Sequence, residues 1–523
     1  MTVRLRGFAL VLALLTLRGA PPRTPMADWL TDGGDPQRTA WQQQETAISP
    51  SSVRGMKLLW KLQLDNVPRQ MHALFPPLVA GRADTSTGPK QIAVVAGVSN
   101  NLYAIDADTG TLLWKRHFDR GFTPPFDGRP PWTLCPGGMT ATPVMAPGSS
   151  PGTYVVYAVT WDGKLHTLDV ATGDELAAPA KFMPPNGKPY ALNLWRGVVY
   201  AGTSEECGDN PDRLYAFDLA SKTTSFFDPN GGGLWGRRGP SIGTDGAVYS
   251  GTGDNEFEPR LHEFGEAIIA AAFDLSTRRL SLKDYFSPPN SEWMTANDLD
   301  MNTTGPVFPY AGREWIVQSS KECRLWLLDS ASLGGPAHRT AAYTTPVMCN
   351  EHAQWQSAGV WGALGTWVDS AGARWIAAPF WGPKHPQFSA PLEHGVVTNG
   401  AVVAFMLLER DGHPILSPRW ISRDMNRADP PVVANGVVFG YGAGEDTTQT
   451  WTVGGQRIEE TSGRIAHSTH AVIYALDAAT GDELWSSGDQ IASWNHFSGL
   501  SVANGRVYIG TYDGFVYCFG VQR

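Results

Sequence analysis

Three short acidic segments hold the side chains of this sequence that could bind a cation. They are Glu205-Glu206, Asp254-Asn255 and Asp298-Leu-Asp300. Calcium takes hard oxygen ligands from carboxylate and amide groups, and the two adjacent glutamates come at the end of an apolar run, residues 198–201, that predicts a strand. A solvated pair of loop glutamates, and an Asx turn at Asp298, explain the same residues without a ligand. The segments therefore predict a calcium site, with plain surface loops as the alternative.

Two other side chains could serve a bound organic ligand. Trp235 offers a flat aromatic surface on which a planar ring could stack. Lys321, at the end of Gln318-Ser-Ser-Lys321, offers a cation to an oxygen atom that gains negative charge. Packing between structural elements is the alternative role for the tryptophan, and an ordinary surface position is the alternative for the lysine.

Composition and cysteine spacing argue against several other classes of protein. The 523 residues include 41 Lys+Arg and 50 Asp+Glu, and the resulting net charge of −9 argues against nucleic acid as a partner. Five cysteines without a Cys-x-x-Cys pair exclude a zinc ribbon and a covalently attached haem. His467 and His470 have no evident third zinc ligand, and residues 440–444 are rich in glycine but lack the strand-to-helix context of a dinucleotide site.

The first 27 residues are typical of an export signal followed by a short linker. Arg4 and Arg6 precede a ten-residue apolar run at residues 8–17, which is too short to cross a bilayer but suits a signal-peptide core. No later apolar run reaches 18 residues, so we expect no transmembrane segment in the mature chain and a periplasmic or secreted location. Translation from Met26 is the alternative, and it would leave the protein in the cytoplasm.

A recurring phrase indicates the elements that must position these side chains. Residues 102–106 and 473–477 each form a short apolar strand ending in aspartate, followed by Thr-Gly and then by a tryptophan, Trp114 or Trp485. Weaker copies end at Asp169, Asp218, Asp274 and Asp329, and two degenerate copies lie at residues 402–407 and 515–519. The phrase therefore occurs eight times, with short alternating strands between the copies.

Eight copies of a unit that cannot cover its own faces predict an all-β fold, an eight-bladed β-propeller of four-stranded antiparallel blades. The content of 57 Gly, 39 Pro and 20 Trp suits many short strands connected by turns. We expect the repeat aspartates to bind turn N–H groups and the repeat tryptophans to fill the gaps between blades. Residues 58–62 are expected to complete the last blade, and residues 28–523 to form a single domain.

The sequence resembles the quinoprotein alcohol dehydrogenases and their polyvinyl-alcohol-dehydrogenase-like relatives. The resemblance rests on the opening Trp29-Leu-Thr-Asp-Gly-Gly-Asp35, on Ile48-Ser-Pro50, and on the repeat phrase, which is that family's tryptophan-docking motif. It implies an eight-bladed propeller that uses pyrroloquinoline quinone (PQQ) together with Ca²⁺ to oxidise a small-molecule or polymeric alcohol. The motif specifies the fold more strongly than the activity.

The same resemblance assigns roles to the candidate residues. Trp235 would form the floor under the quinone, and Lys321 would contact the quinone oxygens. Asp298 would be the general base, with Asp300 as the alternate. The residues implied as calcium ligands are Glu205, Glu206, Asp254, Asn255 and Asp298. Glu205 would also lie beside the cofactor.

Three departures from the family pattern favour another interpretation. Asp254 stands where the family has asparagine, no tryptophan directly precedes Asp298, and the adjacent Cys–Cys pair of the alcohol dehydrogenases is absent, with only Cys207 near the glutamates. No Cys-x-x-Cys-His occurs, so electrons would pass to a separate cytochrome c-type or other acceptor. The alternative is a non-catalytic propeller that acts as a binding or assembly scaffold in the cell envelope. The long segments at residues 122–132, 380–394 and 442–465 could shape a mouth over the site.

Overall fold

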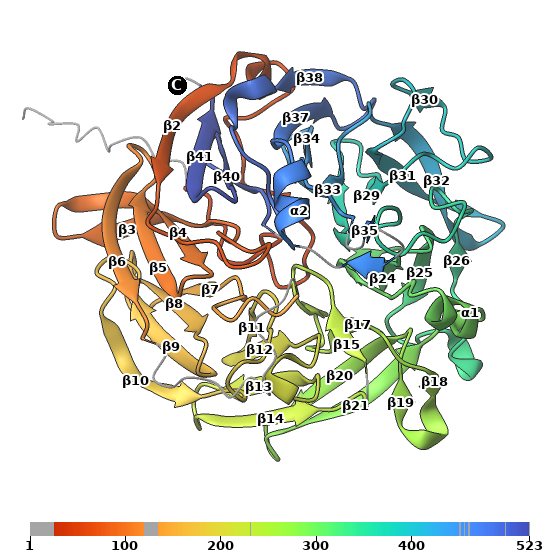
Figure 1. The fold of residues 1–523 in the computed structure, drawn as a ribbon, viewed down its shortest axis with the longest axis horizontal. Coiled ribbons are helices and arrows are strands. Elements are labelled where there is room, and N and C mark those ends of the chain that lie inside the picture. Colours follow the sequence, from red (N-terminus) through yellow and green to blue (C-terminus); the bar gives the residue numbers. More distant parts are fainter. Residues whose placement is uncertain are drawn as a thin grey trace, which may run out of the picture.

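The computed structural model describes residues 26–119, 134–230, 232–448, 451–453, 456–458, 461–496 and 498–521. Across these ranges the chain forms a closed ring of eight antiparallel sheets around a central axis (Figure 1). The predicted eight-bladed propeller is therefore confirmed. The predicted export signal, apart from its last two residues, and the segment at residues 122–132 lie outside the described residues.

The first four blades follow one another along the chain. Blade one contains β3 (Leu78–Thr85), β4 (Gly88–Gly97), β5 (Asn101–Asp106) and β6 (Thr111–His117). Blade two contains β7 (Val144–Pro147), β8 (Tyr154–Val159), β9 (Lys164–Asp169) and β10 (Glu175–Lys181). Blade three contains β11 (Asn193–Trp195), β12 (Val198–Gly202), β13 (Leu214–Asp218) and β14 (Thr223–Phe227). Blade four contains β15 (Gly233–Trp235), β16 (Ser241–Ile242), β17 (Val248–Gly253), β20 (Ile268–Asp274) and β21 (Arg279–Phe286).

The remaining four blades continue around the ring. Blade five contains β23 (Val307–Tyr310), β24 (Arg313–Ser319), β25 (Leu325–Asp329) and β26 (Tyr343–Thr344). Blade six contains β28 (Gly365–Val368), β29 (Arg374–Trp381), β31 (Gly400–Arg410), β32 (His413–Ile421) and β30 (Leu392–Glu393). Blade seven contains β1 (Trp41–Gln42), β33 (Ala428–Ala434), β34 (Val437–Gly442), β37 (Val472–Asp477) and β38 (Glu483–Ser486). Blade eight contains β39 (Ser501–Ala503), β40 (Arg506–Gly510), β41 (Phe515–Gly520) and β2 (Lys57–Gln63).

Short elements connect or extend the blades. The helices are α1 (Ser291–Ala296) and α2 (Thr461–His467). The paired short strands are β18 (Phe257–Glu258) with β19 (Glu263–Phe264), β22 (Thr303–Thr304) with β27 (Gly362–Ala363), and β35 (Trp451–Val453) with β36 (Gln456–Ile458). Five 3₁₀ turns are described: η1 (Ser52–Gly55), η2 (Cys207–Asp209), η3 (Pro259–Leu261), η4 (Gly335–Ala337) and η5 (Gly488–Gln490).

The eighth blade closes the ring by joining early and late parts of the chain. Strand β2 pairs antiparallel with β41, so that Leu58 faces Phe519 and Leu62 faces Val516. This confirms the strand predicted at residues 58–62. Because β2 covers the outer edge of the last sheet, neighbouring blades stabilise one another around the whole ring.

Tryptophans on the outer strands join neighbouring blades. Trp60, Trp114 and Trp420 donate their indole N–H groups to backbone carbonyls of the next blade, at Ala107, Val170 and Ala478. Each ring also lies against the turn glycine of that blade, as Trp60 does against Gly110. The predicted structural role is confirmed for Trp114, which fills the gap between two blades, and Trp485, the other tryptophan of the phrase, packs against Phe519 of the next blade with ring centroids 5.5 Å apart.

The repeat aspartates hold the turns that receive these rings. In each of six copies the carboxylate accepts a hydrogen bond from the backbone N–H two residues later. These aspartates are Asp106, Asp169, Asp218, Asp274, Asp329 and Asp477. The apolar part of the phrase is apolar because it is buried: every residue of β5 is buried, whereas the outer strand β6 is mostly exposed.

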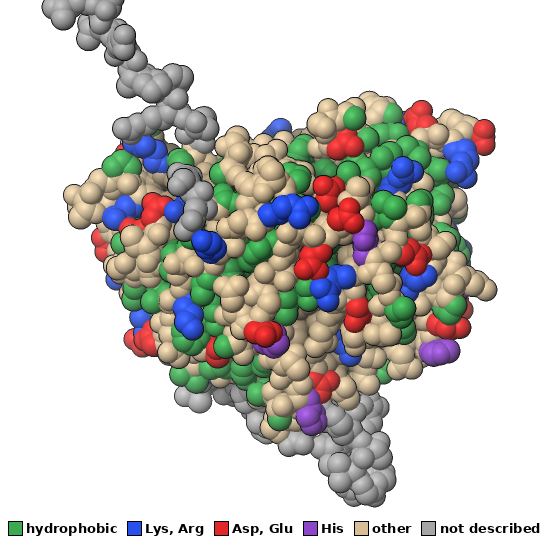
Figure 2. All heavy atoms as spheres, turned by 90° about the horizontal axis from the view of Figure 1, so that it is seen from above, with side chains coloured by type: hydrophobic (Ala, Val, Ile, Leu, Met, Phe, Trp, Pro, Cys, Tyr) green, Lys and Arg blue, Asp and Glu red, His purple; other side chains and the backbone are tan. Residues whose placement is uncertain are grey.

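The outer surface of the ring carries charges of both signs. Figure 2 shows the molecule from its edge, with lysine and arginine side chains mixed among aspartate and glutamate on that face. Within the described ranges, neither helix has the length and apolar character that a bilayer crossing needs.

Candidate functional site

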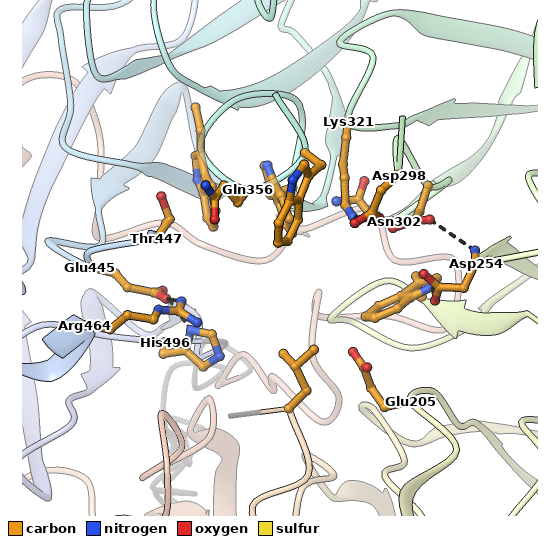
Figure 3. A pocket seen from close by; sticks show the side chains of 16 residues that line it. Glu205, Asp254, Asp298, Asn302, Lys321, Gln356, Glu445, Thr447, Arg464 and His496 are labelled. Carbon is orange, nitrogen blue, oxygen red and sulfur yellow. Dashed lines mark hydrogen bonds and ion pairs between the residues drawn. The ribbon is translucent and has the colours of Figure 1, made fainter. Parts of the chain in front are cut away.

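One cavity contains most of the candidate residues, which come from three blades and the connections between them (Figure 3). Glu205 follows β12, Trp235 ends β15, Asp254 follows β17, and Lys321 follows β24, so each side chain is held where a strand ends. Asp298 lies between α1 and β22. The cavity is lined by Leu134, Glu205, Trp235, Asp254, Asp298, Asp300, Asn302, Lys321, Trp355, Gln356, Trp361, Trp381, Glu445, Thr447, Arg464 and His496.

Lys321 bridges two of the carboxylates. Its Nζ lies 2.7 Å from Oδ1 of Asp298 and also contacts Oδ2 of Asp300. Burial alone would raise the pKa of Asp300, but the charge of Lys321 holds that pKa below its usual value. Burial opposes the charge on Lys321 as well, but the two carboxylates outweigh it and raise the lysine pKa. The lysine is therefore a fixed cation in the wall of the cavity.

Asp254 adds a third carboxylate to this pair. One oxygen from each of Asp254, Asp298 and Asp300 lies within 4.8 Å of the others. The backbone N–H of Asp254 donates to Oδ1 of Asp300 over 3.1 Å. Burial, with the nearby charges of Asp300 and Glu205, raises the pKa of Asp254 to about 8. The cluster thus holds more negative charge than Lys321 offsets, which is the environment that stabilises a bound cation.

Trp235 lies beside the carboxylates with its ring on the cavity wall. Its indole N–H donates to Oδ2 of Asp254 over 3.1 Å. The Nζ of Lys188 lies 5.8 Å from the tryptophan ring and 5.4 Å from the ring of Tyr190. The hydrogen bond fixes the orientation of the indole, so the ring can provide a preformed surface for a planar ligand.

Glu205 reaches the same cavity from the neighbouring blade. Its Oε1 lies 3.7 Å from Nζ of Lys188, a side chain that is only 2% exposed. Burial raises the pKa of Glu205, and the charge of Lys188 opposes that shift. Lys188 was not predicted as a site residue, because a lysine in the loop sequence Asn-Gly-Lys-Pro gives no sign of burial. The structure adds it as the counter-charge of Glu205.

Three of the acidic residues in the cavity adopt a backbone conformation that is unfavourable for residues other than glycine. Glu205, Asp254 and Asp298 have φ angles of 72°, 66° and 55°, in the left-handed region. Residues other than glycine seldom occupy this region, and such strain concentrates at functional sites. The turns that follow β12, β17 and α1 thereby direct the three side chains to one place.

Two of the predicted calcium ligands lie apart from this cluster. Glu206 is exposed and does not line the cavity, and its backbone N–H donates to Asp212. Asn255 donates its side-chain amide to the carbonyl of Asn230, also outside the cavity lining. Of the predicted ligand set, the structure therefore brings together Glu205, Asp254 and Asp298, and it adds Asp300.

Two buried polar groups near the cluster could not be predicted from the sequence. Asn302 lines the cavity at 5% exposure, and neither its amide oxygen nor its amide nitrogen has a hydrogen-bond partner among the described residues. Glu266 is fully buried, and burial together with the charge of Asp300 raises its pKa well above the usual value. Unpaired buried polar groups are rare in folded proteins, so Asn302 fits a site that a ligand completes.

Two disulfides flank the cavity. Cys135 bonds to Cys207, two residues after Glu205, and Cys323, two residues after Lys321, bonds to Cys349. The sequence left the pairing of Cys207 open, because its partner is 72 residues away and comes close only through folding. Cys518 is a free, buried thiol. The disulfides fix the loops that carry Glu205 and Lys321.

Solved structures of similar fold are known. The chain is similar to a europium-containing methanol dehydrogenase, with a TM-score of 0.58 and 12% identity over 94% of this chain and 98% of that one. It is similar to quinohemoprotein alcohol dehydrogenases of Pseudomonas putida (TM-score 0.56, 14% identity) and Comamonas testosteroni (TM-score 0.54, 16% identity), in each case over 95% of this chain and 80% of the other. The predicted resemblance to quinoprotein alcohol dehydrogenases is thus confirmed at the level of the fold.

A second comparison matches part of the sequence. Residues 38–176 fit a family described as outer membrane protein assembly factor BamB. The matched part contains β1, β2, blade one and blade two up to the start of β10, and it ends before Glu205, Trp235, Asp254, Asp298 and Lys321. No curated protein matches the sequence.

Proposed function

We propose that this protein oxidises an alcohol by hydride transfer to PQQ bound with a cation in the cavity, and passes the electrons to a separate acceptor. The observation that carries the proposal is the position of Lys321 between Asp298 and Asp300, beside Asp254 and against the wall formed by Trp235. Carboxylates, a buried cation and a flat ring within one cavity suit a planar, anionic, metal-binding cofactor.

The residues present fit the cation and the cofactor. Asp254, Asp298 and Asp300, with Glu205 nearby, supply hard carboxylate oxygens, and the unpaired amide of Asn302 could complete the set. Trp235 would lie under the quinone ring, with Lys321 beside its oxygens. When bound, PQQ accepts the hydride, while the cation, which we propose to be calcium, withdraws charge from the quinone oxygen.

The residues of this chain perform the remaining steps. The Asp298 carboxylate accepts the proton of the substrate hydroxyl as the carbon gives up its hydride, and the alcohol leaves as a carbonyl compound. The ammonium group of Lys321 stays charged and stabilises the negative charge that develops next to it. The rings of Trp361 and Trp381 line the cavity and stack with their centroids 4.6 Å apart. They keep water away from the reacting atoms.

Titration of the purified protein with PQQ, with and without Ca²⁺, tests the proposal. We expect calcium-dependent quenching of tryptophan fluorescence, followed by reduction of an artificial electron-accepting dye when an alcohol is added. Asp298→Asn should keep the quenching and lose the dye reduction. Unchanged turnover in this variant would remove Asp298 from the reaction.

A scaffold in the cell envelope is the second candidate, favoured by the match of residues 38–176 to an outer-membrane assembly factor family. That match lies in the repeats of blades one and two, where the recurring phrase serves packing between blades. It includes none of the cavity carboxylates. Absence of PQQ binding, together with the capture of an envelope protein by the intact chain, would favour the scaffold.

A periplasmic or secreted location fits the proposed chemistry. Disulfides such as Cys135–Cys207 and Cys323–Cys349 form and persist in oxidising compartments. A cytochrome c-type acceptor in the same compartment would receive the electrons. Fractionation of cells that express the full chain, followed by detection of the mature protein, distinguishes this location from the cytoplasm.

A further inference from the structure

A second pocket, with a volume of about 570 Å³, lies between blades six and seven, which are neighbours in the ring (Figure 1). Its walls come from the turn after β28, the turn between β33 and β34, the turn after β37, and residues 41–50. The volume falls within the range of about 300–1,000 Å³ that is typical of small-molecule sites. The proposed reaction makes no use of this pocket.

The pocket is separate from the cavity that holds Lys321. Strand β34 begins at Val437, directly after the pocket residue Gly436, and ends at Gly442. Glu445, which lines the cavity, follows shortly after that strand. A strand of this length spans roughly 20 Å, at about 3.3 Å per residue. The pocket and the cavity therefore lie at opposite ends of β34, and a ligand in one does not contact the other.

Three tryptophans give the pocket its aromatic walls. Trp367 and Trp375 are 2% and 4% exposed and stack with ring centroids 5.6 Å apart. The indole N–H of Trp375 donates to Oδ2 of Asp369 over 2.8 Å, which holds this pair in place. Trp41 packs against the same hydrophobic cluster but is only partly buried. Its flat apolar ring can therefore pack against a flat apolar face of a ligand.

Trp367 carries a hydrogen-bond donor that the protein does not use. The side chain is almost fully buried, yet its indole N–H has no hydrogen-bond partner among the described residues. A buried tryptophan usually pairs its N–H, because a polar group with little access to water costs free energy when it is unpaired. A ligand in this pocket that offers an acceptor oxygen to Trp367 would remove that cost.

Other polar groups of the pocket are also available to a ligand. The side-chain amide of Gln43 and the hydroxyl of Ser370 form no hydrogen bond within the described part of the chain. Oδ1 of Asp477 accepts two backbone N–H groups of its turn, whereas no described residue donates to Oδ2. Together these groups can both donate and accept, which suits a ligand with several hydroxyl groups.

The charges of the pocket narrow the class of ligand. Glu45, Asp369 and Asp477 line it without an ion pair to any described residue, and no described lysine, arginine or histidine lines it. An anionic ligand would be repelled by these carboxylates. A cation would be attracted, but it would leave the N–H of Trp367 without an acceptor. A neutral ligand with hydroxyl groups satisfies both the donor and the carboxylates.

We propose that this pocket binds a neutral sugar unit, either free or within a polysaccharide. A sugar ring has an apolar face of C–H groups, which would pack on Trp41, and an edge of hydroxyl groups that both donate and accept. One sugar oxygen would accept from Trp367, and a hydroxyl group would donate to the carboxylate of Asp369. Because the pocket is separate from the cavity, the inference holds whether or not the protein oxidises an alcohol.

Calorimetric titration of the intact, PQQ-free protein tests the inference without turnover. The probes are the methyl glycosides of glucose, galactose and mannose, together with a trisaccharide of each sugar. We expect saturable binding of at least one sugar, and no binding of choline or glucuronate, a cation and an anion of similar size. An affinity that rises from the monosaccharide to the trisaccharide would identify a polysaccharide as the source, and an equal affinity would identify a free sugar.

Variants of the pocket separate stacking, hydrogen bonding and charge. Trp41→Leu should lower the affinity for the bound sugar by about tenfold. Trp367→Phe keeps an aromatic ring but removes the N–H, and it should lower the affinity by about fivefold. Asp477→Asn keeps an acceptor and removes the charge, so sugar affinity should stay within about twofold. The matched control is Trp293→Leu, since Trp293 is an exposed tryptophan of α1 outside the pocket.

Two results would overturn the inference. One is the absence of binding by every sugar in a protein that is folded by circular dichroism. The other is sugar binding that survives Trp41→Leu but is lost in Trp235→Ala, because it would place the sugar in the cavity. Gln43→Ala, at an exposed position, provides a variant that should fold normally and still weaken sugar binding by about threefold.

Discussion

The ammonium nitrogen of Lys321 lies 2.7 Å from Oδ1 of Asp298, although the lysine follows β24 and the aspartate belongs to the connection before β22. Lys321 also contacts the buried Asp300. A buried lysine between two carboxylates is costly to desolvate unless the partners stay paired. The stability of this region and the proposed chemistry therefore depend on the same three side chains.

Replacement of Asp298 by asparagine should reduce PQQ-dependent turnover by about 100-fold or more, because a general base contributes roughly 10²–10⁴ to the rate. The amide keeps the size of the side chain, so PQQ binding should persist. Steady-state dye reduction and fluorescence titration measure the two effects. Asp274→Asn, at an exposed repeat turn, is the control and should keep wild-type turnover.

Replacement of Lys321 by methionine should destabilise the fold by about 3–5 kcal/mol, because it leaves the buried Asp300 and the half-exposed Asp298 without their counter-charge. Chemical denaturation measures the loss. The combined variant Lys321→Met with Asp298→Asn and Asp300→Asn should recover part of it, since the unpaired charges are gone. If the combined variant lost as much free energy of unfolding as the three single variants added together, this electrostatic coupling would be contradicted.

Replacement of Gly110 by alanine should destabilise the interface between blades eight and one. A Cβ at Gly110 would lie 2.7 Å from the ring of Trp60, and φ at this glycine is 73°. Backbone strain costs about 1–2 kcal/mol and overpacking about 1–3 kcal/mol more. Gly372→Ala is the matched control, because φ there is 83° but nothing lies within 4 Å. Equal melting temperatures for the two variants would rule out the packing contribution.

Replacement of Cys323 and Cys349 by serine should lower the free energy of unfolding by about 3 kcal/mol, the size expected for a closed loop of this length. Asn350, the residue directly after Cys349, donates its side-chain amide to the carbonyl of Lys321. Loosening the loop should therefore also weaken calcium binding, which calorimetry measures. Unchanged stability and unchanged calcium affinity would show that the disulfide does not support the site.

The fold was predictable because its signals are local and repeated. Each aspartate and tryptophan of the phrase acts on a turn or on the adjacent blade, so one copy such as residues 102–114 contains most of the information. The closing strand at residues 58–62 could also be predicted, because early and late segments of the chain must meet when the ring closes.

The site was predictable only in part, because its members act across blades. Trp235, Asp254 and Lys321 each follow or end a strand and Asp298 follows α1, and the resemblance to a known family placed them in one cavity. Lys188, by contrast, lies in a loop whose burial depends on packing around the ring axis, and no local pattern shows it.

The cavity wall formed by Glu445, Arg464 and His496 was not predicted for a related reason. The segment at residues 442–465 was expected to shape the mouth of the site, and its Glu445 and Arg464 do line the cavity. Arg464 and His496 lie 19 and 51 positions from Glu445 in the sequence, so their pairing with it follows from the fold. The partner of Cys207 was hidden in the same way, since a disulfide between distant cysteines follows from the fold and not from their spacing.

The most direct test of the central claim is the calcium-dependent titration of the purified, disulfide-bonded protein with PQQ. The account predicts saturable quenching of tryptophan fluorescence that weakens when Ca²⁺ is removed, that is reduced by Trp235→Ala, and that is followed by dye reduction with an alcohol. The absence of quenching at any PQQ concentration, in a protein that is folded by circular dichroism, would contradict the claim and favour a propeller without cofactor chemistry.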